Sequence, residues 1–203
     1  MAADPTPQKR ALRAELRERR RNLTQKERAL ATEGLTARLT ALTRALDART
    51  VSCYLSTNDE PDTRPFVNWA RAAGLRVLFP ITRADGLLDW TTATDEEEEV
   101  VGLFGMPEPA GELLGPIAIN DADLILVPAA AVDEHGMRLG WGRGYYDKTL
   151  GSMERCPPVY GVLFDTELLD AVPAERHDQC VDGVVTPART VEFATRDRHH
   201  RRI

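Results

Sequence analysis

Apolar residues recur at helical spacing near the start of the chain. Thr6 followed by Pro7 is typical of a helix start, and the helix predicted there runs to about residue 22. Thr24 and Glu27 form a capping-box pattern, which predicts that a second helix begins at this point. The apolar positions that recur along these two helices are Ala11, Leu12, Leu16, Ala31, Leu35, Leu39 and Leu42.

Short apolar runs separated by helical segments fill the rest of the chain. Strands are predicted at 51–55, 75–79, 87–91, 123–127, 159–164 and 181–185, and helices at 65–73 and from Tyr145 onwards. Pro80 is expected to end the second strand, FGMPEP at 104–109 to be a connecting loop, and the acidic run 95–99 to be a solvated face. Strands that alternate with helices predict an α/β fold with a largely parallel or mixed central sheet flanked by helices.

Length and composition favour one soluble domain. The chain has 203 residues, of which 42% are hydrophobic and 29% charged, and neither a repeat nor an internal linker divides it. We therefore expect a single domain over 1–195, followed by a disordered basic tail at 196–203. No apolar run approaches the ~20 residues that span a bilayer, and the start lacks a hydrophobic signal core, so no membrane partner is expected. Three cysteines without a CxxC pair are typical of free thiols in the cytoplasm.

The net charge of −6 conceals basic ends around an acidic body. Residues 9–28 hold nine Lys or Arg against three acidic residues, and residues 196–202 hold four Arg against one Asp. A basic helix of this kind can simply be solvated, or it can face phosphates. RNA binding through the basic ends is disfavoured, because the body is acidic and no RNP-like aromatic motif is present.

The stretch from Gly136 to Leu150 reads GMRLGWGRGYYDKTL and lies between a predicted strand and a predicted helix. Glycine tolerates positive φ and lets a ligand approach the backbone, while a helix N-terminus and nearby guanidinium groups favour an anion such as phosphate. The alternative is a tight turn without a ligand, since the stretch is neither a Walker A loop nor a GxGxxG motif. Asp147, one turn into the helix, is well placed to hold a hard cation such as Mg²⁺.

Two further places are candidates for ligand binding. Lys9, Arg10 and Arg13 lie in the first two turns of the first helix, where positive charge opposes the helix dipole. A ligand phosphate would remove this conflict, although an ordinary surface position for Lys9 is equally consistent with the sequence. Glu60 follows a strand at the edge where open α/β sheets bind ligands, so it is either a substrate contact or a charge at a helix start.

Five segments, in order along the chain, resemble the 5-formyltetrahydrofolate cyclo-ligase family, also called 5,10-methenyltetrahydrofolate synthetase. RLGWGRGYYD at 138–147 is similar to the family's ATP-binding loop, and KRALR at 9–13 is similar to its basic N-terminal segment. YLSTNDE at 54–60 resembles its substrate-binding segment, FGMPEP its FGIxEP element, and the segment from 173 its P-x-E-x-HD element. Trp141 departs from the family pattern, in which a smaller or more flexible residue is common.

The resemblance implies a fold like the layered NagB/RpiA/CoA-transferase group. It also implies conversion of 5-formyltetrahydrofolate to 5,10-methenyltetrahydrofolate, with ATP as cosubstrate and Mg²⁺ as cofactor, and without a nucleic-acid partner. We expect a monomer or a weak homo-oligomer. The residues implied for catalysis are Lys9, Arg143 and Tyr145, and those implied for the metal are Asp147 and Asp178. The residues implied for ATP are Lys9, Arg10, Ala11, Leu12, Arg13, Arg138, Leu139, Gly140, Trp141, Gly142, Arg143, Gly144, Tyr145 and Tyr146. Those implied for the folate are Leu55, Glu60, Trp141, Gly142, Arg143, Gly144 and Tyr145.

A protein that binds folate or nucleotide without turnover is the main alternative. Loss of Lys9, Arg143 or Asp147 would favour such a sensor, but all three are present. Phosphoryl transfer depends mainly on alignment and charge neutralisation, so an enzyme needs cations and a metal more than a strong nucleophile. The residues therefore favour an enzyme.

Overall fold

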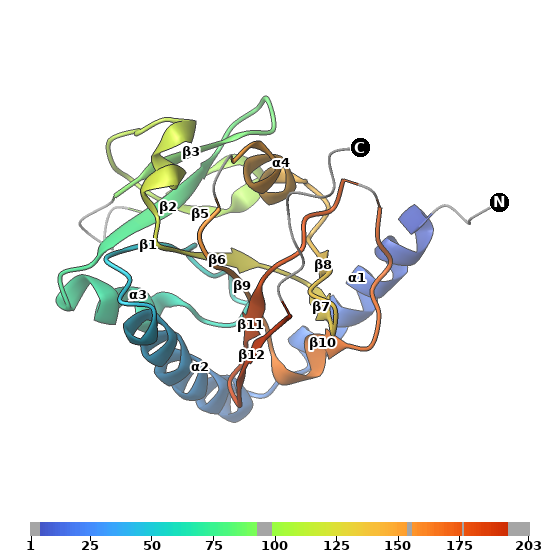
Figure 1. The fold of residues 1–203 in the computed structure, drawn as a ribbon. Coiled ribbons are helices and arrows are strands. Elements are labelled where there is room, and N and C mark those ends of the chain that lie inside the picture. Colours follow the sequence, from blue (N-terminus) through green and yellow to red (C-terminus); the bar gives the residue numbers. More distant parts are fainter. Residues whose placement is uncertain (1–4, 93–98, 154–155, 176, 195–203) are drawn as a thin grey trace.

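The computed structural model describes residues 5–92, 99–153, 156–175 and 177–194, in which a seven-stranded sheet lies between two layers of helices (Figure 1). The α/β class with a largely parallel central sheet, predicted from the sequence, is confirmed. No helix in these ranges is long and apolar enough to cross a membrane. The predicted tail at 196–203 and most of the acidic run at 95–99 lie outside the described residues.

The central sheet is mixed, with a parallel interior. Its strands are β1 (Thr50–Ser52), β2 (Arg76–Thr82), β3 (Leu88–Thr91), β6 (Leu124–Pro128), β9 (Val159–Val162), β11 (Gly183–Val185) and β12 (Thr190–Glu192). They lie in the order β12-β11-β9-β6-β1-β2-β3. The five inner strands run parallel to one another, whereas β12 and β3 are antiparallel edges. The carboxyl ends of the parallel strands therefore share one edge, which is where such sheets bind ligands.

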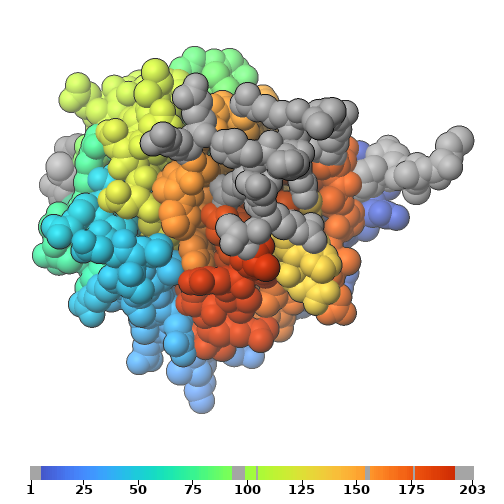
Figure 2. Space-filling view, viewed as in Figure 1, coloured from blue at the N-terminus to red at the C-terminus, as the bar shows by residue number. Residues whose placement is uncertain are grey.

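Helices cover both faces of this sheet. They are α2 (Gln25–Ala45), α3 (Arg64–Ala72) and α4 (Tyr145–Ser152), whereas α1 (Pro5–Arg21) packs beside a smaller sheet. Within β6, Leu124 and Leu126 belong to the core under α2 and α3, while Ile125 and Val127 belong to the core that includes Leu150 of α4. This alternation is the two-residue period of a strand buried on both faces. Figure 2 shows the blue-to-cyan surface of α2 beside the red surface of β11 and β12, which come from the other end of the chain.

Two smaller sheets complete the fold. Strands β7 (Ala131–Asp133), β8 (Arg138–Leu139) and β10 (Leu168–Leu169) form a three-stranded sheet, and α1 packs beside it by burying Leu16 with Leu139 and Val172. Strands β4 (Glu99–Val101) and β5 (Pro107–Pro109) form a two-stranded ribbon. The described residues also form the short 3-10 turns η1 (Leu103–Gly105), η2 (Pro116–Asp121) and η3 (Asp165–Glu167).

The helix predictions hold closely, and two predictions about prolines are wrong. The capping box is present, since Thr24 Oγ1 accepts from the N–H of Glu27 and the Glu27 carboxylate accepts in return. Pro80 does not end β2, which continues by pairing with β3. The pairing with β1 stops at Leu78, so no partner on that side needs the missing proline N–H. The segment 107–109 is the strand β5 and not a loop, because its partner β4 supplies a pairing that local sequence does not reveal.

Candidate active site

Two cavities meet at the loop between β8 and α4. The first, of about 400 Å³, is here called the apolar cavity; its lining includes Tyr54, Leu55, Phe79, Pro80, Leu88, Met106 and Trp141. The second, of about 700 Å³, is here called the charged cavity; its lining includes Lys9, Arg13, Lys148, Glu175, His177 and Asp178. Four residues border both: Gly140, Arg143, Gly144 and Asp147. Both volumes suit small molecules, whose sites span roughly 300–1,000 Å³.

The loop between the cavities depends on two glycines in the left-handed region. Gly142 has φ 98° and Gly144 has φ 71°, values that residues with a Cβ rarely adopt. Arg13 of α1 reaches into this turn, where its Nε donates to the carbonyl oxygen of Gly140 at 2.7 Å. A Cβ on Gly142 would lie 3.3 Å from the Arg13 guanidinium. Because Gly144 is the N-cap of α4, the N-terminus of that helix lies at the border of both cavities.

Three arginines at helical spacing face this loop from α1. Arg13 binds the loop directly, and the guanidinium carbons of Arg17 and Arg20 lie 5.2 Å and 4.8 Å from the centre of the Trp141 ring. Arg20 is buried and donates two hydrogen bonds to the Glu167 carboxylate, at 2.6 Å and 2.8 Å. Sequence reasoning missed Arg17 and Arg20, although their i+4 and i+7 spacing from Arg13 was a usable signal.

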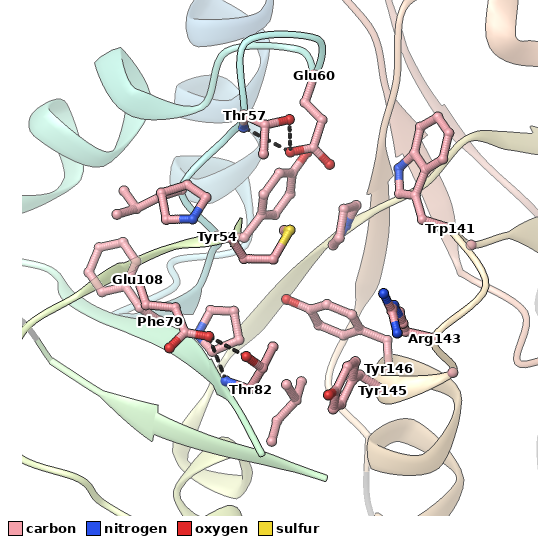
Figure 3. A pocket seen from close by; sticks show the side chains of 18 of the residues that line it. Tyr54, Thr57, Glu60, Phe79, Thr82, Glu108, Trp141, Arg143, Tyr145 and Tyr146 are labelled. Atoms are coloured by element: carbon pink, nitrogen blue, oxygen red, sulfur yellow. Dashed lines mark hydrogen bonds between the residues drawn. The ribbon is translucent and has the colours of Figure 1, made fainter. Parts of the chain in front are cut away.

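The apolar cavity contains donors that lack an acceptor. Figure 3 shows Tyr54 and Glu60 on one wall and Trp141, Tyr145 and Tyr146 on the other. The hydroxyls of Tyr54 and Tyr146 and the indole Nε1 of Trp141 are buried without a hydrogen-bond partner in the described part of the chain. Burial raises the pKa of both tyrosines, so their hydroxyls stay protonated and can donate. A bound ligand with acceptor atoms would remove the penalty of these unpaired groups.

Two buried carboxylates also line the apolar cavity. Oε2 of Glu60 accepts hydrogen bonds from the N–H and the hydroxyl of Thr57, at 2.9 Å and 3.0 Å. Burial raises the pKa of Glu60, and the bonds from Thr57 oppose this only in part. Oε1 of Glu108 accepts from the N–H and the hydroxyl of Thr82, at 2.8 Å and 2.5 Å. Both acids are drawn with these bonds in Figure 3, and their remaining acceptor capacity faces a space that suits a ring with N–H groups.

The charged cavity is built around Lys9, which is not a surface residue. Only 4% of Lys9 is exposed, and its Nζ lies 2.6 Å from both Glu175 Oε2 and Asp178 Oδ2. Burial alone would lower the pKa of Lys9, but the hydrogen bonds to Asp178 and Glu175 outweigh it and raise the pKa. These acids offset the positive charge that opposes the dipole of α1, a role that the sequence assigned to a ligand phosphate.

Asp147 joins the two cavities through an ion pair. Its Oδ1 accepts hydrogen bonds from Nη2 of Arg138 at 2.7 Å and from the N–H of Gln179 at 3.1 Å. Asp147 and Asp178 both border the charged cavity, and carboxylate oxygens are the ligands that Mg²⁺ prefers. Glu175, His177 and Asp178 also offer ligand atoms that lie within 4.8 Å of one another. The donor set therefore fits a hard divalent cation, with Lys9 and Arg138 holding the same acids by charge.

The structure divides the residues predicted from the sequence between the two cavities. Those at the charged cavity are Lys9, Arg13, Leu139, Gly140, Gly142, Arg143, Gly144, Asp147 and Asp178. Those at the apolar cavity are Leu55, Glu60, Arg138, Gly140, Trp141, Arg143, Gly144, Tyr145, Tyr146 and Asp147. Arg10, Ala11 and Leu12 are not among the residues that line either cavity in the described structure. Tyr54 and Glu175 were missed as site residues, although both lie inside segments that the family resemblance had singled out.

Comparisons with known proteins identify the family and the fold. The family model described as the 5-formyltetrahydrofolate cyclo-ligase family matches residues 5–187. The chain is 37% identical over 185 residues to a 5-formyltetrahydrofolate cyclo-ligase of Mycolicibacterium smegmatis, covering 89% of this chain and 94% of that protein. It is 30% identical over 182 residues to the Escherichia coli enzyme of the same name, covering 88% of this chain and 100% of that protein. The solved structure of 5,10-methenyltetrahydrofolate synthetase from Aquifex aeolicus superposes with a TM-score of 0.76 and 27% identity, covering 95% of this chain and 98% of the other.

Proposed function

The chain belongs to the 5-formyltetrahydrofolate cyclo-ligase family, and from this premise we propose that it closes 5-formyltetrahydrofolate to 5,10-methenyltetrahydrofolate at the expense of ATP. The observation that carries the proposal is the junction of the two cavities at Arg143, Gly144 and Asp147. A folate in the apolar cavity and ATP in the charged cavity would bring the formyl oxygen and the γ-phosphate together at this junction. Cyclisation by phosphoryl transfer needs that meeting point.

The two substrates fit the cavities by chemistry. The pterin ring is flat and carries N–H donors and ring acceptors, which match the carboxylate of Glu60 and the unpaired hydroxyls of Tyr54 and Tyr146. The triphosphate is anionic and matches Lys9, Arg13 and the N-terminus of α4. Tyr145 borders the folate side, and its hydroxyl donates to the carbonyl oxygen of Arg83 at 2.9 Å, which fixes the ring beside the junction.

The reaction then proceeds in two transfers. The formyl oxygen attacks the γ-phosphorus, the bond to the bridging oxygen breaks, and ADP leaves. N10 then attacks the activated formyl carbon, the carbon–oxygen bond breaks, phosphate leaves with the oxygen, and N10 loses its proton to solvent. Arg143 borders both cavities, which supports a role in neutralising charge on the transferring phosphoryl group. The loop that carries Arg143 is held by the hydrogen bond from Arg13, and this keeps the two reactants aligned.

Mg²⁺ is the cofactor that we propose, held by Asp147 and Asp178 at the charged cavity. When bound, it supplies charge neutralisation at the phosphates of ATP. Lys9 would then exchange Asp178 for a phosphate oxygen of ATP. Both the metal ion and Lys9 would thus have a negatively charged partner.

Absorbance at the band of the methenyl product tests the proposed activity. Purified protein mixed with 5-formyltetrahydrofolate should form product only when both ATP and a divalent metal are present, and ADP and phosphate should appear in equal amounts. Product formed equally well without nucleotide would contradict the proposal. Binding of both substrates with no product would instead favour the sensor without turnover.

We also propose a cellular location and an oligomeric state. No disulfide joins Cys53, Cys156 or Cys180 in the described structure, which fits a reducing cytoplasm. A monomer or weak homo-oligomer stays a prediction, to be measured by light scattering.

A further inference from the structure

Arg17, a cation at the apolar cavity, has no acidic partner among the described residues. Arg17 lines this cavity from α1, is exposed, and forms no ion pair in the described part of the chain. Its guanidinium carbon lies 5.2 Å from the centre of the Trp141 ring. Arg17 is therefore a charged group at the open side of a cavity whose interior is largely apolar.

The neighbouring arginines are already engaged. Arg20 is held by the Glu167 carboxylate, with Nε at 2.6 Å from Oε1. Arg138 is held by Asp147 at 2.7 Å. By contrast, an anion that reaches Arg17 would not have to displace an existing acidic partner.

Trp141 offers a second donor at the same edge. Trp141 lines the apolar cavity, and its Nε1 is buried and has no acceptor within the described residues. The ring is held in place because the guanidinium carbon of Arg20, itself fixed by Glu167, lies 4.8 Å from the ring centre. Arg17 and Trp141 thus form a pair of donors whose position is set by α1 before any ligand arrives.

We propose that Arg17 and Trp141 bind the glutamyl end of the folate substrate. This assignment rests on the proposed function, since it takes the folate as the occupant of the apolar cavity. A folate is amphiphilic, with a flat ring system at one end and a glutamate that carries an amide and carboxylates at the other. The pterin ring would lie among Tyr54, Phe79 and Glu60. The glutamyl carboxylate then accepts hydrogen bonds from the guanidinium group of Arg17, and either the amide oxygen or a carboxylate oxygen accepts from Trp141 Nε1.

The pair therefore determines specificity and takes no part in the chemistry. Glutamate lies far from N5 and N10 along the substrate, so its contacts contribute binding energy that is equal in the ground state and the transition state. Interactions of that kind change KM and leave kcat unaltered. Trp141 departs from the family pattern described above, so this route to recognition depends on that departure.

Two substrates that differ only in the glutamate test the assignment. We would compare 5-formyltetrahydrofolate with 5-formyltetrahydropteroate, the same molecule without its glutamate, in the wild-type protein and in Arg17→Gln. The variant should raise KM about fivefold for the glutamylated substrate, as expected for one charged hydrogen bond at a partly exposed site. Its KM for the pteroate, its kcat and its melting temperature should match the wild-type values.

Matched variants make the result specific. Arg19 lies on the same helix and pairs with Glu15 at the exposed surface. Arg19→Gln should therefore leave the KM for both substrates unchanged. Trp141→Phe keeps the ring and removes the indole N–H, so it should raise KM for the glutamylated substrate by a smaller factor. Equal KM changes for both substrates in Arg17→Gln, or no change for either, would overturn the assignment of Arg17.

The outcome also separates this assignment from the proposed function. If the wild-type protein forms methenyl product from both substrates and the KM ratio is unaffected by Arg17→Gln, only the glutamyl site is wrong. If the wild-type protein forms product from neither substrate, the proposed function is wrong, and the assignment of the glutamyl site is wrong as well.

Discussion

The two cavities differ in how their polar groups are satisfied before any ligand binds. In the apolar cavity, Tyr54, Tyr146 and Trp141 bury donors that have no partner among the described residues. In the charged cavity, Lys9 already has its counter-charges, in Glu175 and Asp178. A ligand in the first cavity completes hydrogen bonds that the fold leaves unmade, whereas a ligand in the second must exchange partners that the fold has already supplied.

This difference predicts different binding behaviour. An unpaired buried donor gains a full hydrogen bond when an acceptor arrives, so the apolar cavity should bind with little rearrangement. An ion pair must be broken before a phosphate can reach Lys9, so metal and nucleotide should bind the charged cavity together more readily than either does alone. Four substitutions, ordered from the largest expected effect, would break or sharpen this comparison.

Asp147→Asn should give the largest loss, because this residue belongs to both cavities. Asparagine keeps the shape but removes the charge that pairs with Arg138 and that would hold Mg²⁺. We expect the rate to fall by about a hundredfold or more, with partial recovery at high Mg²⁺ and with folate binding retained.

The measurement is the rate as a function of Mg²⁺ concentration for both proteins. Asp121→Asn, which alters an exposed pair with Arg76, serves as the control and should follow the wild-type curve. Superimposed curves for Asp147→Asn and the wild type would leave Asp147 as the partner of Arg138 and of the α4 dipole only.

Lys9→Met should lower stability and ATP affinity together. The substitution leaves Glu175 and Asp178 without their buried counter-charge, which should lower the free energy of unfolding by about 3 kcal/mol. The same freed carboxylates should bind Mn²⁺ without nucleotide more tightly than the wild type does.

Thermal unfolding and Mn²⁺ titration in the absence of ATP check this pair of effects. Lys26→Met, at an exposed position of α2, should change neither the melting temperature nor the affinity for Mn²⁺. An unaltered melting temperature with weakened ATP binding would mean that the ion pairs of Lys9 contribute nothing to stability. The two cavities would then not differ in the way described above.

Glu60→Gln should lower kcat/KM for the folate about tenfold, as expected when one charged acceptor is lost. Burial raises the pKa of Glu60 above its ordinary value of 4.5, despite the bonds from Thr57. As the pH falls, Glu60 should therefore protonate earlier than an exposed glutamate, and wild-type kcat/KM should decline at a pH above 4.5.

The pH profile of kcat/KM distinguishes this role from simple packing. The acidic decline should be weakened in Glu60→Gln and retained in Glu33→Gln, which alters an exposed residue of α2. The same decline in both variants would assign it to another group.

Tyr54→Phe should give the smallest effect and the clearest contrast. Its hydroxyl is buried without a partner in the described structure, so its removal should leave the melting temperature unchanged or slightly higher. Folate KM should rise about fivefold if a ligand acceptor normally meets that hydroxyl.

Tyr160→Phe is the matched control for the measured KM and melting temperature. Its hydroxyl donates to Glu192 at 3.2 Å and lines neither cavity in the described structure, so stability should fall and folate KM should not move. Reduced stability in Tyr54→Phe without a change in KM would show that the hydroxyl serves the fold.

Local patterns in the sequence determined the elements and the binding loop. The capping box at Thr24, the alternation along β6 and the glycines around Arg143 depend on short-range geometry, so each could be predicted from neighbouring residues. The family resemblance then identified residues most of which line one or both cavities, although Arg10, Ala11 and Leu12 line neither in the described structure.

Tertiary structure alone decided how those residues divide and what they contact. Lys9 and Asp178 lie 169 positions apart, and Arg20 and Glu167 lie 147 apart, so no local pattern reveals either ion pair. Pro80 continues a strand only because β3 pairs on one side and β1 stops on the other. The sequence by itself thus predicted many of the side chains to which we assign the chemistry, while long-range packing decided which of them are already paired, because burial and pairing depend on neighbours that the chain brings together only when folded.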